Sequence, residues 1–294
     1  MNAIKDELNF ILTGSNGWIS RNFISQIKIN YPSANIYEIN RKNGLESIEQ
    51  HSTKYNVFLI HNVFTRAENL IKDMSENQFK SESTKNLRII EHFLKNSNIS
   101  GFFYPSSGSV YKLREKDKNV YKPYSDQKIF EEDFYSNLCE SRNINFVMPR
   151  IFSSIGPFIN NPYAFPISSF IIQSLTQGKI EIQSKNNNLY SFCSLSILSR
   201  AVIKYLVEDV NEIEASPFDA VDYNFNLYDI AIKVAEMNSI SDKDIHYDFD
   251  NTNVEEYIGE PSKYKRLKEK LNIKNDRFEQ ELLTLNEYIK KCYI

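Results

Sequence analysis

Short apolar runs alternate with segments of helical periodicity along the first half of the chain. Five runs have the length of buried strands: residues 8–12, 34–39, 57–61, 101–104 and 145–148. Three segments between them carry apolar residues at helical spacing: residues 19–29, 83–94 and 124–142. Strands that alternate with helices in this way predict a parallel sheet with right-handed crossovers.

The pattern changes after Gly156 and Pro157. A loop is predicted at 158–165. Short elements follow it: a helix at 170–175, a strand at 180–182, a turn at 185–188 and a helix at 198–207. We predict an α/β fold, with a Rossmann-type doubly wound parallel sheet and a smaller C-terminal lobe. The predicted boundaries are 1–158 for the first domain, with 191–207 returning to it, and 159–190 with 208–294 for the lobe. The charged segment 263–270 is interpreted as a solvated helix face.

The composition is that of an ordinary globular protein and argues against several classes of partner. A net charge of -3 gives no general attraction to nucleic acid. No apolar stretch reaches the ~18 residues needed to cross a bilayer, and the first residues do not form an export signal. The 3 cysteines and 4 histidines show neither a disulfide framework nor metal-ligand spacing. We expect a cytoplasmic protein without a metal, a membrane partner or a nucleic-acid partner.

A glycine-containing turn follows the first apolar run, in the sequence TGSNGWIS of residues 13–20. Gly14 permits a tight strand-to-helix turn, and Gly17 lets the backbone approach a pyrophosphate at the N-terminus of the next helix. Ser20 stands at the third glycine of G-x-x-G-x-x-G and is small enough for close packing. Alone, this pattern also fits a plain turn, but the alternation that follows favours a dinucleotide site. The predicted contacts are Gly14, Asn16, Gly17, Trp18 and Ile19.

The end of the second strand bears on which dinucleotide binds. Asn40 stands where a carboxylate would bind the adenosine ribose of NAD, and Arg41 beside it can bind a 2'-phosphate. Glu38 is the alternative carboxylate, but it shares a strand face with Asn40 and lies farther from the ligand end. The sequence favours NADP and leaves NAD open. The alternative for Arg41 is an ordinary surface charge.

Tyr124 and Lys128 form a Y-x-x-x-K pair, with Ser107 upstream in the segment YPSSGSVY of residues 104–111. Residues four apart lie on one helix face, so the lysine charge favours the phenolate and lowers the tyrosine pKa toward the range useful to an acid. The alternative is an accidental exposed pair. Ser106 and Ser109 are nearby alternatives to Ser107 and are interpreted as turn residues, and His61 is interpreted as a packing or strand-end residue in preference to a base.

Together these motifs resemble the extended short-chain dehydrogenase/reductase family, the NAD-dependent epimerase/dehydratase group that acts on nucleotide sugars. The likeness extends to three further segments: residues 60–63 (IHNV), 150–157 (RIFSSIGP) and 261–263 (PSK). The resemblance implies that Tyr124 is the general acid/base, that Lys128 also holds the nicotinamide ribose, and that Ser107 binds the reacting oxygen. It also implies further contacts, to the cofactor by Asn62 and to the substrate by Ser109, Ser153 and Tyr190.

Besides Ser20, four sites of one or two residues depart from the family pattern. Ser153 replaces an asparagine, and Tyr190 stands where an arginine often binds the substrate diphosphate. Residues 196–197 (SI) replace an acidic pair that supports this region, and residues 62–63 (NV) replace a small apolar pair. These departures bear on the nucleotide-diphosphate half of the substrate and not on the chemistry.

The segment after Ser107 narrows the reaction that the resemblance implies. Dehydratases of the family place an acidic pair after the catalytic hydroxyl residue, whereas Gly108 and Ser109 follow here. A reductase or an epimerase remains, and we favour reduction of a 4-keto sugar nucleotide in surface-polysaccharide precursor synthesis. The alternatives are a nucleotide-sugar 4-epimerase and, in a different class, a catalytically silent NAD(P)-binding regulator. The resemblance also implies a homodimer formed through the helices at 83–95 and 125–142.

Overall fold

The computed structural model describes residues 7–65, 74–111, 118–208, 217–250, 252 and 254–294. It divides into two compact units, unit 1 with Met1–Arg150 and Ser199–Phe218, and unit 2 with Ile151–Leu198 and Asp219–Ile294. The segment that returns to unit 1 was predicted at 191–207. Residues 191–194 stay in unit 2 because they pair with strands of that unit.

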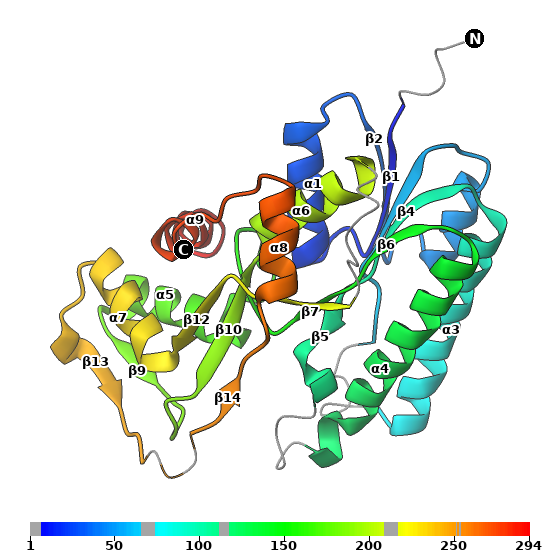
Figure 1. Cartoon of the computed structure of the whole chain (residues 1–294). Helices are drawn as coiled ribbons and strands as arrows, with labels where there is room; N and C mark the ends of the chain where they lie inside the picture. Colours follow the sequence, from blue (N-terminus) through cyan, green and yellow to red (C-terminus); the bar gives the residue numbers. More distant parts are fainter. Residues whose placement is uncertain (1–6, 66–73, 112–117, 209–216, 251, 253) are drawn as a thin grey trace. The chain divides into compact units, whose positions relative to one another are not determined.

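A five-stranded sheet forms the centre of unit 1 (Figure 1). Its strands are β1 (Asn9–Thr13), β2 (Asn35–Ile39), β3 (Val57–His61), β4 (Ile99–Phe103) and β6 (Asn145–Val147). They pair in the order β2-β1-β3-β4-β6, and every pairing is parallel. β1 and β3 are buried at every position, which explains their nearly continuous apolar sequences. The predicted parallel sheet is confirmed.

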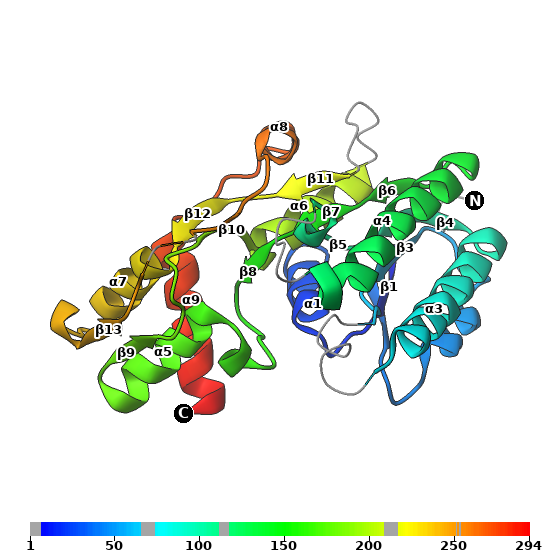
Figure 2. The ribbon, with the colours of Figure 1, turned by 90° about the horizontal axis from the view of Figure 1, so that it is seen from below.

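Helices cover both faces of this sheet, as a doubly wound fold requires (Figure 2). Among the described residues, the helices with residues in unit 1 are α1 (Trp18–Asn30), α3 (Glu76–Asn96), α4 (Lys118–Ser141) and α6 (Leu195–Glu208). On one face, Phe23 of α1 packs on Phe103 with ring centroids 4.6 Å apart. On the other face, α3 and α4 bury Ile90 and Tyr135 against Leu59 and its neighbours. Successive side chains of each strand therefore serve opposite layers of the core.

The helices α3 and α4 begin earlier than their apolar periodicity predicts. The helix predicted from residue 83 begins at Glu76, because Ser75 and Gln78 form a reciprocal cap over its first turn. The side chain of Ser75 accepts from the Gln78 amide at 3.3 Å, and the Gln78 side chain accepts from the Ser75 amide at 2.9 Å. The helix predicted from residue 124 begins at Lys118 and contains Pro123. A short 3-10 helix, η1 (Leu45–His51), was not predicted.

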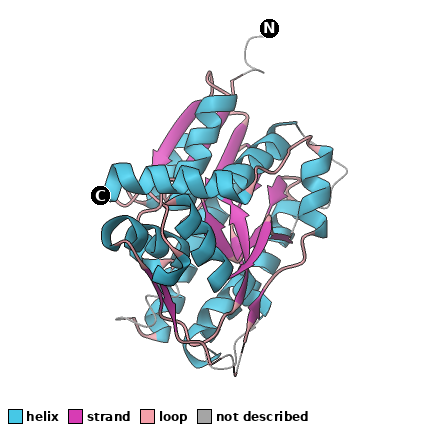
Figure 3. Cartoon of the chain, turned by 90° about the vertical axis from the view of Figure 1, so that its left-hand side faces the viewer, coloured by secondary structure: helices cyan, strands magenta, loops and turns pink. Residues whose placement is uncertain are grey.

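Unit 2 is built around β10 (Leu189–Ser194) (Figure 1), and its last helix ends next to the C-terminus (Figure 3). This strand pairs in parallel with β8 (Ser153–Ile155) and β14 (Glu256–Tyr257), and antiparallel with β12 (Tyr223–Asn226). The remaining elements are η3 (Pro162–Ala164), α5 (Pro166–Gln177), β9 (Ile180–Ile182), α7 (Leu227–Met237), η4 (Asp242–Asp244), β13 (Ile245–Tyr247), α8 (Ser262–Lys270) and α9 (Phe278–Tyr293). α9 packs against α5, α7 and β8. The chain crosses between the units within β7 (Pro149–Ile151) and β11 (Phe218–Ala220), and at residues 198–199 of α6.

Candidate cofactor and catalytic site

The glycine turn lies where the strand order of the sheet reverses. β2 lies on one side of β1 and β3 on the other, and open parallel sheets bind ligands beyond the carboxyl ends of strands at such a point. Gly14 has a φ of +64°, and a Cβ there would lie 2.8 Å from the Asn62 carbonyl oxygen. Gly17 precedes α1, whose first turn carries no acidic residue. The first N–H groups of α1 therefore favour an anion.

Two departures from the family pattern are in contact at this turn. The Ser20 hydroxyl donates to the Thr13 carbonyl at 3.1 Å and accepts from the Asn62 side-chain amide at 2.8 Å. The Asn62 backbone amide donates to Thr13 Oγ1 at 3.1 Å. Ser20 and Asn62 thus join the start of α1 to the end of β3. The serine at the third glycine position has a hydrogen-bonding role beyond being small.

The turn also carries buried polar atoms that a dinucleotide could satisfy. Among the described residues, Ser15 Oγ and Asn62 Oδ1 are buried without a hydrogen-bond partner. Buried polar atoms are normally paired, so a pair of orphans beside a glycine cradle fits a polar ligand. Together with the α1 N-terminus, these atoms fit the pyrophosphate and ribose groups of NAD(P).

The residues after β2 form a polar turn at the same edge of the sheet. Ile39, the last residue of β2, pairs with Thr13, so Asn40 follows directly beside the glycine turn. The Asn40 side chain accepts from the Lys42 amide at 2.9 Å, while Arg41 and Lys42 are exposed. Two exposed cations at this position fit a phosphate better than a ribose hydroxyl.

Lys128 is buried at the carboxyl edge of the sheet, one helical turn after Tyr124 on α4. Its side chain is 2% exposed, and its ammonium lies 5.8 Å from the centroid of the Tyr124 ring. Ser107 lies in β5 (Ser106–Ser107), which packs against α4 together with η2 (Gly108–Tyr111). An accidental exposed pair does not predict a buried lysine, because burying an unneeded charge is costly.

The ammonium of Lys128 is held by groups that the sequence did not single out. It donates to the Tyr104 hydroxyl at 2.6 Å and to the Pro105 carbonyl at 3.2 Å. The Tyr104 hydroxyl donates in turn to Glu131, whose carboxylate lies 3.5 Å from the ammonium. Burial lowers the pKa of Lys128, and Glu131 and then Glu132 oppose that shift.

His61 is a packing residue, as the sequence interpretation has it. Thr13 Oγ1 lies 2.7 Å from His61 Nδ1, within hydrogen-bond distance, and also accepts the Asn62 amide at 3.1 Å. The imidazole stacks on Tyr104 with centroids 5.7 Å apart. Burial, with the nearby Lys128 charge, lowers the pKa of His61 to about 3. The ring is therefore neutral at physiological pH.

A second buried carboxylate fixes the serine segment to α4. Glu132 accepts two hydrogen bonds from Arg150, at 2.8 and 2.7 Å, and a third from the Ser106 hydroxyl. Arg150 also donates to the Tyr111 hydroxyl at 2.8 Å. Ser106 therefore has a structural role, whereas the Ser107 hydroxyl accepts the Ser109 amide at 3.2 Å. Two adjacent acidic residues one turn after Lys128 were the signal available in the sequence.

The predicted substrate residues of unit 2 lie on neighbouring strands. Ser153 of β8 is the register partner of Phe192 on β10, the strand that also carries Tyr190. The Tyr190 ring contacts Phe192 and Tyr257, with centroids 6.5 and 6.4 Å apart. The position where the family has an arginine is therefore occupied by an aromatic cluster.

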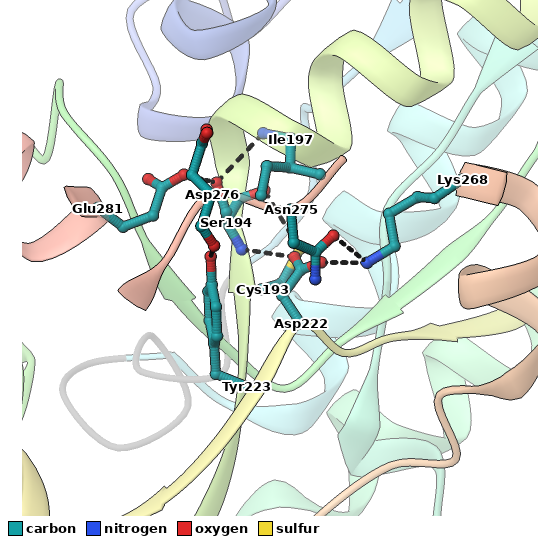
Figure 4. Close-up of polar contacts among 9 residues, drawn as sticks. All are labelled: Cys193, Ser194, Ile197, Asp222, Tyr223, Lys268, Asn275, Asp276 and Glu281. Carbon is teal, nitrogen blue, oxygen red and sulfur yellow. Dashed lines mark hydrogen bonds and ion pairs between the residues drawn. The ribbon is translucent and has the colours of Figure 1, made fainter. Parts of the chain in front are cut away.

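The missing acidic pair at residues 196–197 has a substitute from elsewhere in unit 2 (Figure 4). Ser194 caps α6, since its hydroxyl accepts the Ile197 amide at 3.1 Å. The same hydroxyl donates to Glu281 of α9 at 2.6 Å. A carboxylate at a helix N-terminus is favoured by the helix dipole, so Glu281 supplies the negative charge that residues 196–197 lack.

A buried ion pair joins α8 to the same junction (Figure 4). Lys268 contacts Asp222 and donates to Asn275 at 2.7 Å, while Asp222 accepts the Ser194 amide at 2.9 Å. Burial raises the pKa of Asp222, and Lys268 acts against that shift. The interpretation of residues 263–270 as a solvated face is wrong for Lys268, because its side chain is buried against Asp222. The sequence pattern did not show this burial, since Asp222 is remote in sequence.

The described part of the chain contains neither a membrane-spanning helix nor a metal-binding cluster. None of its helices combines the length and the apolar character needed to cross a bilayer. It also contains no group of three or more His, Cys, Asp or Glu side chains arranged to hold a metal ion.

Comparison with known proteins establishes the fold. No family model matches the chain, and no curated protein matches its sequence. Solved structures do match over nearly the whole chain. A UDP-N-acetylglucosamine 4-epimerase from Methanobrevibacter ruminantium, in complex with UDP-N-acetylmuramic acid, is 18% identical with a TM-score of 0.71, covering 97% of this chain and 99% of that one.

Two other neighbours extend the comparison. RMD from Pseudomonas aeruginosa, complexed with NADPH, is 14% identical with a TM-score of 0.72, covering 97% of this chain and 99% of that one. A UDP-glucuronic acid 4-epimerase from Bacillus cereus, in complex with UDP-glucuronic acid and NAD, has the same identity and TM-score, with 97% and 100% covered. The α/β fold that the family resemblance implies is confirmed by these structures.

Proposed function

We propose that the chain is an NAD(P)-dependent oxidoreductase of the extended short-chain dehydrogenase/reductase family that acts on a nucleotide-linked sugar. The favoured reaction is reduction of a 4-keto sugar nucleotide in surface-polysaccharide precursor synthesis. One observation carries this proposal. A lysine with a side chain 2% exposed lies one turn after Tyr124, at the same sheet edge as the Gly14 turn.

The proposed roles follow from this placement. A reduced dinucleotide, when bound, would supply the hydride for the sugar carbonyl carbon and would itself be oxidised. Tyr124 gives its proton to the carbonyl oxygen, Ser107 donates a hydrogen bond to that oxygen, and Lys128 holds the nicotinamide ribose. The first-turn amides of α1 bind the pyrophosphate. We propose NADP as the preferred cofactor, because exposed Arg41 and Lys42 follow β2 where NAD would need a carboxylate.

The test is turnover of NADPH with a nucleotide-linked 4-keto-6-deoxy sugar. Tyr124→Phe keeps the ring and removes the transferable proton, so turnover should fall ~100-fold or more. Ser107→Ala should cost roughly 1.5–3 kcal/mol of transition-state stabilisation. Tyr135→Phe, which removes a buried hydroxyl elsewhere on α4, is the matched control and should turn over normally. Normal turnover by Tyr124→Phe would contradict the site assignment.

A nucleotide-sugar 4-epimerase is the second candidate, supported by the epimerases among the structural neighbours. It would interconvert two nucleotide sugars without net consumption of cofactor. Bound cofactor with no turnover of either kind would support the catalytically silent regulator. Because Tyr190 lies in an aromatic cluster where an arginine would bind diphosphate, we propose that the free nucleoside diphosphate binds weakly.

The proposed state in the cell is a cytoplasmic homodimer. The three cysteines are all free, which fits a reducing compartment. The dimer is proposed to form through α3 and α4, where Phe130 is 54% exposed and stacks on Phe134. An exposed aromatic pair on a helix is the kind of surface that a protein interface covers.

A further inference from the structure

The Lys128 ammonium has three protons, and the structure directs two of them. One goes to the Tyr104 hydroxyl at 2.6 Å and one to the Pro105 carbonyl at 3.2 Å. Glu131 does not take the third by a good hydrogen bond, because its carboxylate lies 3.5 Å away. The carboxylate is connected to the lysine through Tyr104, whose hydroxyl accepts from the ammonium and donates to Glu131. The Phe64 ring also faces the ammonium, with its centroid 4.4 Å away. Among the described residues no oxygen or nitrogen accepts the third proton, which is therefore open to a ligand.

The charges around Lys128 single out Glu131 as its counter-ion. Tyr124, Glu131 and Glu132 face it from α4, and Tyr104 and a neutral His61 face it from the strand ends. Glu132 is neutralised by two hydrogen bonds from Arg150. Glu131 is buried, and its second oxygen accepts from Gln127 at 3.0 Å. A buried ammonium needs a compensating charge, and Glu131 provides it.

We propose that Tyr104 and Glu131 are positioning residues that keep Lys128 charged and its third proton directed at the bound dinucleotide. This inference rests on the proposed function. Tyr104 sets the direction of the ammonium, and Glu131 sets its charge. A direct hydrogen bond from Lys128 to Glu131 would use the third ammonium proton, which would then not be available to a ribose hydroxyl. Tyr104 lies between the two groups and connects them without using that proton.

The two roles predict different effects on NADPH binding, measured by cofactor fluorescence over an alkaline pH series. In the wild type, affinity should fall at high pH as Lys128 loses its proton. Glu131→Gln should move that fall to lower pH by about one unit or more, because the charge that favours the ammonium is gone. Tyr104→Phe should weaken binding about 10-fold at every pH and shift the fall less, because it changes no charge.

Two variants are controls on the same helix. Asp133→Asn removes an exposed carboxylate, and Tyr135→Phe removes a buried hydroxyl from a ring that packs on Tyr104. Both should bind NADPH as the wild type does over the whole pH series. A purely structural role for the network would lower the unfolding temperature and leave the pH dependence of binding unchanged.

The outcomes separate this inference from the proposed function. A wild type that binds neither NADPH nor NADH overturns both. If the wild type binds NADPH, two results overturn the positioning role alone. One is that the pH dependence of NADPH binding in Glu131→Gln coincides with that of the wild type. The other is that Asp133→Asn shifts it by the same amount as Glu131→Gln. Should Glu131→Gln fail to fold, Tyr104→Phe still decides, since unchanged affinity in that variant overturns the proposal.

Discussion

Replacing Lys268 by methionine should destabilise the protein in a pH-dependent way. The change keeps most of the side-chain volume and removes the cation that contacts Asp222, a carboxylate with a fully buried side chain. Asp222 keeps the Ser194 amide as a donor at 2.9 Å. Removing one partner of a buried ion pair typically costs about 3–5 kcal/mol. For a chain of this size, that corresponds to an unfolding temperature lower by very roughly 6–20 °C.

Protonation of Asp222 limits this cost and gives it a sign with pH. Burial already raises the pKa of Asp222, and without Lys268 the folded-state pKa rises further above the unfolded value. The folded variant then takes up a proton, so its deficit grows with pH between the two pKa values. Proton uptake by Asp222 lowers the free energy of unfolding by at most about 1.36 kcal/mol for each pH unit above an unfolded-state pKa of ~3.9. The largest loss through Asp222 is therefore about 5.5 kcal/mol at pH 8 and about 1.5 kcal/mol at pH 5.

The measurement is thermal or urea unfolding of the wild type and variants at about pH 5 and pH 8. Lys265→Met is the matched control, because Lys265 lies on the same helix with a side chain 74% exposed. The double variant Asp222→Asn with Lys268→Met removes both charges and should show no extra pH dependence. If Lys268→Met had equal deficits at both pH values, or matched Lys265→Met at pH 8, the buried pair would not be the cause.

Three further predictions concern the cofactor, the glycine turn and assembly. The wild type should bind NADPH more tightly than NADH, and Arg41→Ala should remove most of that preference in fluorescence titrations; equal wild-type affinities would contradict the NADP assignment. Asn62→Ala should cost roughly 1 kcal/mol in unfolding experiments and less in a Ser20→Gly background, since the two side chains share a 2.8 Å hydrogen bond; strictly additive costs would rule out the coupling. Light scattering at micromolar concentration should show a dimer, and Phe130→Glu should shift it toward monomer; a monomeric wild type would refute the dimer.

The sheet could be predicted because its signal is local. Each strand of unit 1 is a short apolar run, and the turn after β1 carries its glycines in the sequence itself. Element ends were harder, because the start of α3 depends on a polar cap at Ser75 and Gln78 and not on apolar spacing. The partners of buried charges were out of reach, since Asp222 and Lys268 meet only after folding.

The surroundings of the candidate catalytic pair, Tyr124 and Lys128, were also out of reach of the sequence. The spacing of Tyr124 and Lys128 places them on one helix face, but nothing local shows that Lys128 is buried or that Tyr104 reaches it. A tyrosine at the end of β4 and a glutamate on α4 read as ordinary residues one at a time. Their chemistry arises only when the strand end and the helix come together.

Departures from a family pattern are best judged by their spatial neighbours. Ser20 contacts Asn62, so two departures support one another, and Glu281 supplies the charge absent from residues 196–197. Tyr190 differs, because its neighbours are the rings of Phe192 and Tyr257, and neither replaces the charge of an arginine. The first two departures preserve the scaffold, whereas we propose that the third changes what the site can bind. Tyr190 is therefore the position at which we expect the substrate of this protein to differ from those of the structural neighbours.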